Sequence, residues 1–328
     1  MQRLARLIAR LPYPSPRQQW AVGLAVVLTQ ATIGVTGSVV RVTGSGLGCS
    51  TWPGCHAGTM FPTAHPEYET LNQWIEFGNR LLTGVVGLAA VLGVIVAWRV
   101  HQEAGGRRRL LTLAVAVLGG TGLQGVLGGI TVLAGLLWWT VALHFLVSAA
   151  LVWIAVLLAR AFREGDGRPR WLVSPVTNRL LQAMAVLLAT VLVAGTMVTG
   201  AGPHGGDPDT PRLSWSIDVL AAVHAALLVT FLVVLALVGV SLLRTPAPRL
   251  LVRRYALLWL AALAQGGLGS LQYQLGVPEG LVSLHVLGAA LVVICAAALW
   301  CSARDRGPAP QPSAREPAEA TSPRAVAA

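Results

Sequence analysis

Charge is scarce in this sequence. Of its 328 residues, 11% are charged and 55% are hydrophobic, whereas about 25% of residues are charged in typical soluble domains. So few charges exclude an intrinsically disordered chain and argue against a soluble one. Lysine is absent, and all 24 basic residues are arginine. The net charge of +11 would suggest nucleic-acid binding in a soluble domain. In a membrane protein it can instead arise from positively charged cytoplasmic loops.

Long apolar stretches take up most of the chain. About 20 mostly apolar residues cover the hydrocarbon core of a bilayer. Eight such stretches predict eight transmembrane helices: 20–40, 75–98, 110–133, 138–160, 180–200, 217–243, 254–275 and 280–301. The first stretch is long for the apolar region of a signal peptide and has no clear cleavage site. We therefore interpret it as a retained helix, preceded by a cytoplasmic segment, 1–19.

The arginines divide unevenly between the two sides of these spans. Twenty-one of the 24 fall in the N-terminal segment, in alternate loops and in the C-terminal tail, and the exceptions are Arg41, Arg80 and Arg212. With the acids included, one side carries +15 and the other −4. Positive loops face the cytoplasm, so we expect a plasma-membrane protein with both termini inside and no nucleic-acid partner. The Pro- and Ala-rich tail, 303–328, is predicted to be disordered.

An internal repeat organises the spans. Two motifs recur: VTGSGLG at 42–48 returns as VTGAGPH at 198–204, and QGVLGG at 124–129 returns as QGGLGS at 265–270. In each half a histidine follows the repeated glutamine by 20 residues, at His144 and His285. We therefore predict an all-α protein built from two tandem, parallel four-helix halves, 20–165 and 170–302.

Three histidines lie inside predicted spans at a similar depth: His144, His224 and His285. Ionisable groups inside membrane helices are costly and usually functional, although a packing histidine bonded to a neighbouring hydroxyl is an alternative. At this depth the spans contain no cysteine and no acid except Glu76, which argues against a zinc or copper cage. A haem needs only two imidazoles facing each other across a bundle. His224 and His285, both in the second half, form the natural pair.

The first half carries charged residues where the second half has His224. The segment there reads WIEFGNR (74–80), in which Glu76 and Asn79 share a helix face and Arg80 follows. An arginine at this depth could pair with haem propionates. Glu76 allows two interpretations: an i,i+4 ion pair with Arg80 at the helix end, or a buried carboxyl that donates or accepts a proton.

Two of the four cysteines, Cys49 and Cys55, lie in the first long outer loop, in CSTWPGC. The outer side of the membrane permits disulfides, and the five residues between them can close through a turn at Pro53 and Gly54. A redox-active dithiol and two free thiols are the alternatives. The second long outer loop contains no cysteine, which excludes a second disulfide there.

Together these motifs resemble the haem A synthase family. The resemblance covers about residues 20–300 and rests on RVTGSGLGCSTWPGC (41–55), EFGNR (76–80), QGVLGGITV (124–132), LHF (143–145), AAVHAALL (221–228) and SLHVLG (283–288). It implies an oxidoreductase that converts a ring methyl of haem O to a formyl group. Two hydroxylations would give a geminal diol that loses water. The product, haem A, would serve terminal oxidase assembly.

The resemblance also implies a division of labour between the halves. The second half would hold a haem b cofactor, with His224 and His285 as its axial ligands. The first half would be catalytic and would hold the haem O substrate, with His144 as a ligand of its iron. Haem O synthase (protohaem farnesyltransferase), cytochrome oxidase assembly factors and an unidentified electron donor are the implied partners.

Four further residues match or depart from the family pattern. Glu76 matches the acidic residue proposed to act in catalysis, and Cys49 and Cys55 match a cysteine pair found in part of the family. The family commonly has E-x-x-H-R, and Asn79 stands at the position of that histidine. The resemblance therefore implies that His144 alone holds the substrate iron, with the sixth position open or bound to water.

Two other functions fit parts of the sequence. A b-type cytochrome for membrane electron transfer is one, but a simple carrier would more readily keep a bis-histidine pair in each half. A haem transporter is the other, suggested only by the spans and the repeat. The chain lacks the broken midplane helices and acidic relays expected of a coupled transporter.

Overall fold

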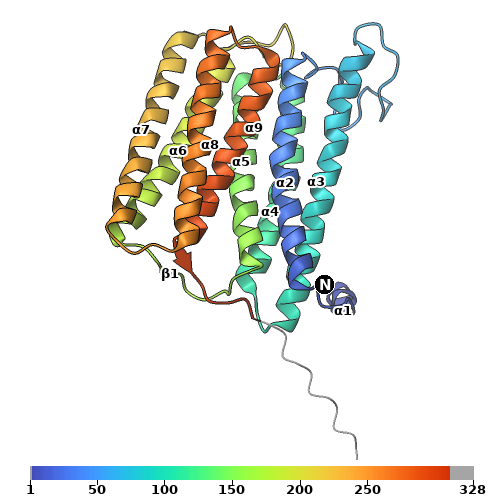
Figure 1. Ribbon diagram of the computed structural model, residues 1–328. Helices are drawn as coiled ribbons and strands as arrows, with labels where there is room; N and C mark the ends of the chain where they lie inside the picture. The colour runs from blue at the N-terminus through green and yellow to red at the C-terminus, as the bar shows by residue number, and fades with distance from the viewer. Residues whose placement is uncertain (1, 311–328) are drawn as a thin grey trace, which may run out of the picture.

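The computed structural model describes residues 2–310, which form a bundle of long helices lying side by side (Figure 1). The described elements are α1 (Gln2–Ala9), α2 (Pro16–Val42), α3 (Thr70–Glu103), α4 (Arg108–Leu133), α5 (Trp138–Ala161), β1 (Arg170–Trp171), α6 (Pro175–Ala201), α7 (Ile217–Leu243), α8 (Arg249–Gln274), α9 (Glu279–Ser302) and β2 (Arg304–Asp305). The short helix α1 and the strands lie at one end of the bundle, and the long loop between α2 and α3 lies at the other (Figure 1).

Each predicted span coincides with a helix, α2 to α9, and the ends agree to within five residues. Seven of these helices are long and apolar enough to cross a membrane, which indicates a multi-pass membrane protein. The exception is α8, although it is as long as its neighbours. Arg253 and Arg254 near its start, and the polar and glycine-rich stretch around Gln265, make it less apolar.

The long helices pack in two groups. In the first, α2 contacts α3, α3 contacts α4, α4 contacts α5, and α5 returns to α2. The second, α6 to α9, closes in the same way. Helix α9 packs on α2 and α5, and α5 also packs on α6, so these helices join the two groups.

Apolar side chains fill the bundle toward the α1 end. In the second group Phe231, Leu235 and Leu258 are at most 1% exposed, and in the first group Val26 and Leu110 are fully buried. Lipid tails are as apolar as these side chains, so in a bilayer close packing rather than exclusion of water holds such helices together. The packed cores leave the opposite part of the bundle for a cavity.

Polar contacts fasten the loops at the α1 end. Arg107 is 2% exposed and donates through Nε to Asp166 Oδ1 at 3.0 Å. Its Nη2 donates to the carbonyl oxygens of Ala161 and Glu164 at 2.6 and 2.5 Å. These bonds tie the α3–α4 turn to the loop after α5. Arg99 of α3 donates a hydrogen bond from Nε to the carbonyl oxygen of Leu11, in the N-terminal segment, at 2.7 Å.

The start of the C-terminal tail is ordered. Strand β2 pairs with β1 in antiparallel fashion, with Arg170 opposite Asp305 and Trp171 opposite Arg304. The Gly165 N–H also donates to the carbonyl oxygen of Gly307 at 2.8 Å. The sequence assigns residues 303–310 to a disordered tail, and this part is instead held against the loop before α6. The rest of that predicted tail, 311–328, lies outside the described residues.

Candidate functional site

A cavity of about 1000 Å³ occupies the part of the bundle away from α1. Its wall contains the three membrane histidines and Glu76, and it draws residues from both helix groups. The volume is at the upper end of the range of about 300–1000 Å³ usual for small-molecule sites. The candidate residues of the two halves therefore face one shared space.

His224 on α7 and His285 on α9 line the second-group side of the cavity, close enough to interact electrostatically. His224 donates from Nδ1 to the carbonyl oxygen of Val191 on α6 at 3.0 Å. Such a bond fixes the neutral tautomer and leaves Nε2 without a proton, which is the state that binds iron.

A glycine lies against each imidazole ring of the pair His224 and His285. A Cβ added at Gly195 would lie 3.1 Å from Cε1 of His224, and one at Gly269 would lie 2.8 Å from Cε1 of His285. An alanine at Gly269 would therefore displace the His285 ring. Two imidazoles that line one cavity, each with a glycine beside its ring, are a donor set that fits a flat iron macrocycle between α7 and α9.

The first group repeats this geometry around His144 on α5. Gln124 donates from Nε2 to the carbonyl oxygen of His144 at 2.9 Å, and Gln265 makes the same bond to His285 at 2.8 Å. A Cβ added at Gly128 would lie 3.4 Å from Cε1 of His144. The repeated Gln and His of the sequence thus form the same contact in both groups.

Glu76 lies on the first-group side of the cavity and is 4% exposed. Its Oε1 pairs with Arg80 Nη2, and its Oε2 accepts the backbone N–H of Cys49 at 2.8 Å. The i,i+4 ion pair, one of the two interpretations of the sequence, is therefore present. The same carboxylate also faces the space beside His144.

Asn79 lines the cavity on the same helix. Its Oδ1 accepts a hydrogen bond from Thr36 Oγ1 of α2 at 2.7 Å. The side chain therefore links α3 to α2 at the cavity wall.

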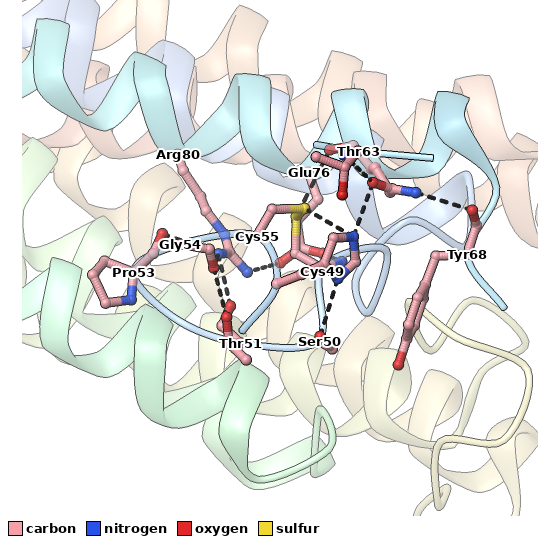
Figure 2. Close-up of a disulfide and its surroundings, with 12 residues drawn as sticks. Cys49, Ser50, Thr51, Pro53, Gly54, Cys55, Thr63, Tyr68, Glu76 and Arg80 are labelled. Atoms are coloured by element: carbon pink, nitrogen blue, oxygen red, sulfur yellow. Dashed lines mark hydrogen bonds and ion pairs between the residues drawn. A yellow bond between two sulfur atoms is a disulfide. The ribbon is translucent and has the colours of Figure 1, made fainter. Parts of the chain in front are cut away.

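The loop 49–55 is fastened to the same stretch of α3, as Figure 2 shows. Cys49 and Cys55 form a disulfide, which confirms the first of the three predicted alternatives. Arg80 Nη1 donates to three carbonyl oxygens of this loop, those of Thr51, Pro53 and Gly54, at 2.8, 3.2 and 2.8 Å. Arg80, predicted to be able to pair with propionates, is therefore occupied by the loop and by Glu76.

Two arginines of the cavity wall were missed by the sequence analysis. Arg41 ends α2, and Arg212 lies in the loop between α6 and α7. Together with Arg80, they are the three arginines that fall on the less positive side of the spans, and all three line the cavity. That exceptional placement was the available signal, because a charge set against the prevailing distribution calls for a local reason.

Comparison with known proteins identifies the family of the chain. The family profile COX15-CtaA, described as cytochrome oxidase assembly protein, matches residues 18–205, more than half of the chain. The chain is 34% identical to the heme A synthase of Shouchella clausii over 52% of each chain. It is also 34% identical to that of Halalkalibacterium halodurans over 47% of each. These matches span about half the length of the relatives. A heme A synthase of Sphingopyxis alaskensis is 30% identical over 89% of this chain and 93% of its own.

Proposed function

Because the chain belongs to the COX15-CtaA family of cytochrome oxidase assembly proteins, we propose that it oxidises a ring methyl of haem O to a formyl group and so makes haem A. One observation carries the proposal. A single cavity has a histidine pair on one side, and His144 with Glu76 on the other. Such asymmetry suits one resident haem beside one haem that is converted.

The proposed cofactor is haem b, held by His224 and His285. When bound, this haem would supply electron transfer between the donor and the first-half site. The chain's own contribution is to hold its ligands in place. The Val191 carbonyl keeps Nε2 of His224 unprotonated, and Gly195 and Gly269 keep the space beside the rings open.

The proposed substrate site is the first-group side of the cavity. His144 would bind the iron of haem O there, and Asn79 gives no second imidazole at the family's histidine position. Glu76 would accept or return protons as the methyl group is hydroxylated twice and as the resulting geminal diol loses water to give the formyl group. The Cys49 N–H and Arg80 hold that carboxylate toward the cavity.

We also propose that all eight helices α2 to α9 cross the plasma membrane as two tandem, parallel four-helix bundles, residues 20–165 and 170–302, with both termini in the cytoplasm. Helix α8 packs against α7 and α9, and its 26 residues extend about 39 Å. That length is enough to cross the hydrocarbon core of about 30 Å. The arginine-rich loops would face the cytoplasm.

The proposed reaction needs partners that supply its substrate and receive its product. Haem O would come from haem O synthase, a protohaem farnesyltransferase. Haem A would pass to cytochrome oxidase assembly factors, and a separate electron donor would reduce the bound haem b.

Conversion of the substrate tests the proposed function. The full-length protein, expressed in aerated cells that make haem O but have no other haem A synthase, should yield haem A on acid–acetone extraction and chromatography. His144→Ala should leave haem O unconverted, since the substrate iron loses its ligand. If wild-type cells contain only haem B and unchanged haem O, the enzyme proposal fails and the b-type cytochrome becomes the better account.

A further inference from the structure

Two arginines from different helix groups meet at the cavity wall. Arg41 and Arg212 lie close enough for their charges to repel each other. The loops that carry them are joined, because the Gly46 N–H donates to the carbonyl oxygen of Gly206 at 2.8 Å. A Cβ added at Gly206 would lie 3.5 Å from Cγ of Arg41, so Arg41 packs beneath the loop that holds Arg212. Two like charges are thus held together by the fold itself.

No carboxylate of residues 2–310 pairs with either arginine. Arg212 uses Nη2 for the carbonyl oxygens of Thr199, at 2.7 Å, and Gly202, while its Nε is buried with no partner. The Arg41 guanidinium makes no hydrogen bond or ion pair within the same described residues. By contrast, Arg107 and Arg109 at the α1 end are both paired with acids.

The internal repeat has no arginine at the position that matches Arg41. This residue directly precedes the VTG motif at 42–44, and the residue before the repeated motif at 198–200 is Met197. Helix α6 continues through its VTG motif to Ala201, whereas α2 ends at Val42 within its own. A helix thus reaches this motif in the second group without an arginine at the matching position.

Burying a charge lowers the stability of the folded protein unless a charge of opposite sign pairs with it. Burial lowers the pKa of the Arg212 guanidinium, as expected for a cation without a counter-charge. Both haems of the proposed function carry two propionate carboxylates on one edge of the ring, and a planar guanidinium matches a carboxylate with two parallel hydrogen bonds.

We propose that Arg41 and Arg212 form a subsite that binds the propionate carboxylates of haem in the cavity. The inference rests on the proposed function. The pair lies where α2 ends and in the α6–α7 loop, at the junction of the two helix groups, whereas the histidines lie within their helices. These arginines would therefore be in a position to receive the propionate edge of a haem whose iron the histidines hold. The subsite would orient the macrocycle and neutralise both sets of charges.

Titration with haem and with its esters tests this subsite. Full-length protein from haem-starved cells would be titrated with haem B and haem O, and with their dimethyl esters, in which both propionates are blocked. Wild type should bind at least one of the free acids about 10-fold more tightly than its ester. The double variant Arg41→Gln/Arg212→Gln should lose that preference, because it keeps hydrogen-bond donors but no charge.

The titrations with haem B and with haem O show which of the two haems binds at the subsite. Loss of the acid preference for haem B assigns the subsite to the cofactor, and loss for haem O assigns it to the substrate. Arg108→Gln, an exposed arginine at the α1 end, is the matched control and should keep the wild-type preference. Arg41→Lys/Arg212→Lys retains both charges and should keep most of it, which separates loss of charge from misfolding.

An unchanged acid preference in the Gln double variant would overturn the subsite. The proposed function can fail separately. A wild-type protein that prefers the free acids but forms no haem A would retain the subsite and refute the enzyme.

Discussion

At the scale of single residues, the proposed function gives the Glu76 carboxylate two tasks: to hold the disulfide loop and to move a proton. One oxygen pairs with Arg80, the other accepts the Cys49 N–H, and the group faces the cavity. Holding the disulfide loop requires only a hydrogen-bond acceptor. Moving a proton requires a group that ionises. A substitution that keeps a hydrogen-bond acceptor but cannot ionise separates holding the loop from moving a proton.

Glu76→Gln should therefore lower the rate of haem A formation at least about 100-fold while leaving the haem b spectrum intact. The glutamine oxygen can still accept the Cys49 N–H, so the loop should stay in place. The measurement is haem A produced per bound haem b over time. Wild-type turnover in Glu76→Gln would reduce Glu76 to a structural ion pair.

The residues of the site differ in how far the sequence could predict them. His144, His224 and His285 were predictable because an imidazole within an apolar helix is conspicuous, and spacing relative to the repeat sets its depth. For Arg41 and Arg212 the sequence offered only their place on the less positive side of the spans, and nothing in it predicted that they lie together. Their pairing depends on the contact between two loops far apart in the chain.

At the scale of elements, the loop 49–55 is a small lid held by a disulfide and one arginine. Trp52 at its centre lies against α4, where a Cβ added at Gly129 would come within 2.7 Å of the indole Cδ2. The disulfide closes the loop on itself, but Arg80 and Glu76 attach it to α3. The attachment therefore depends on polar contacts rather than on the covalent bond.

Arg80→Ala should release this lid while the helices stay folded. Three backbone carbonyls and Glu76 would lose their donor, so amide hydrogen exchange in residues 49–60 should rise at least about 10-fold. Exchange within α6 to α9 should not change. Arg108→Ala is the control. Wild-type protection of the loop in Arg80→Ala would mean that Arg80 does not hold it, and that the disulfide and the remaining bonds of Glu76 and Gln73 are enough.

Helix α8 shows how residues that line a candidate site can lower the hydropathy of a helix. Its Gln265 bonds the backbone of His285, and its Gly269 stands against the ring of that histidine. Both residues make the helix less apolar, which is one reason why it is not among the seven apolar helices. The length and the repeat predicted the helix correctly where its hydropathy alone is ambiguous.

Whether α8 crosses the membrane is testable at its two ends. On a background with Cys295→Ser and Cys301→Ser, Gln274→Cys should react with a membrane-impermeant maleimide in intact cells. Arg249→Cys should react only after the membrane is opened, because the arginine-rich end faces the cytoplasm. Both positions are exposed. Labelling of both, or of neither, in intact cells would contradict the proposed eight-span topology.

At the scale of the whole molecule, the first group separates packing from the cavity. Its buried cluster lies toward α1 and the cavity toward the long loops, while the second group's cluster reaches the cavity wall at Phe231 and Val292. The sequence predicted the helices, their ends and the repeat from hydropathy and motif spacing. It could not predict β2, because that strand is two residues long and exists only through pairing with the distant residues 170 and 171.

The central claim is that one cavity holds two haems, each assigned to one helix group. The most direct measurement is the haem content of purified wild type, His224→Ala and His144→Ala, by optical spectrum and by extraction. His224→Ala should lose the low-spin haem b and still bind haem O, and His144→Ala should keep haem b and form no haem A. His101→Ala, at the α1 end, should match wild type. Loss of both haems together from either variant whose helical fold is intact, or an unchanged haem b spectrum in His224→Ala, would contradict this division.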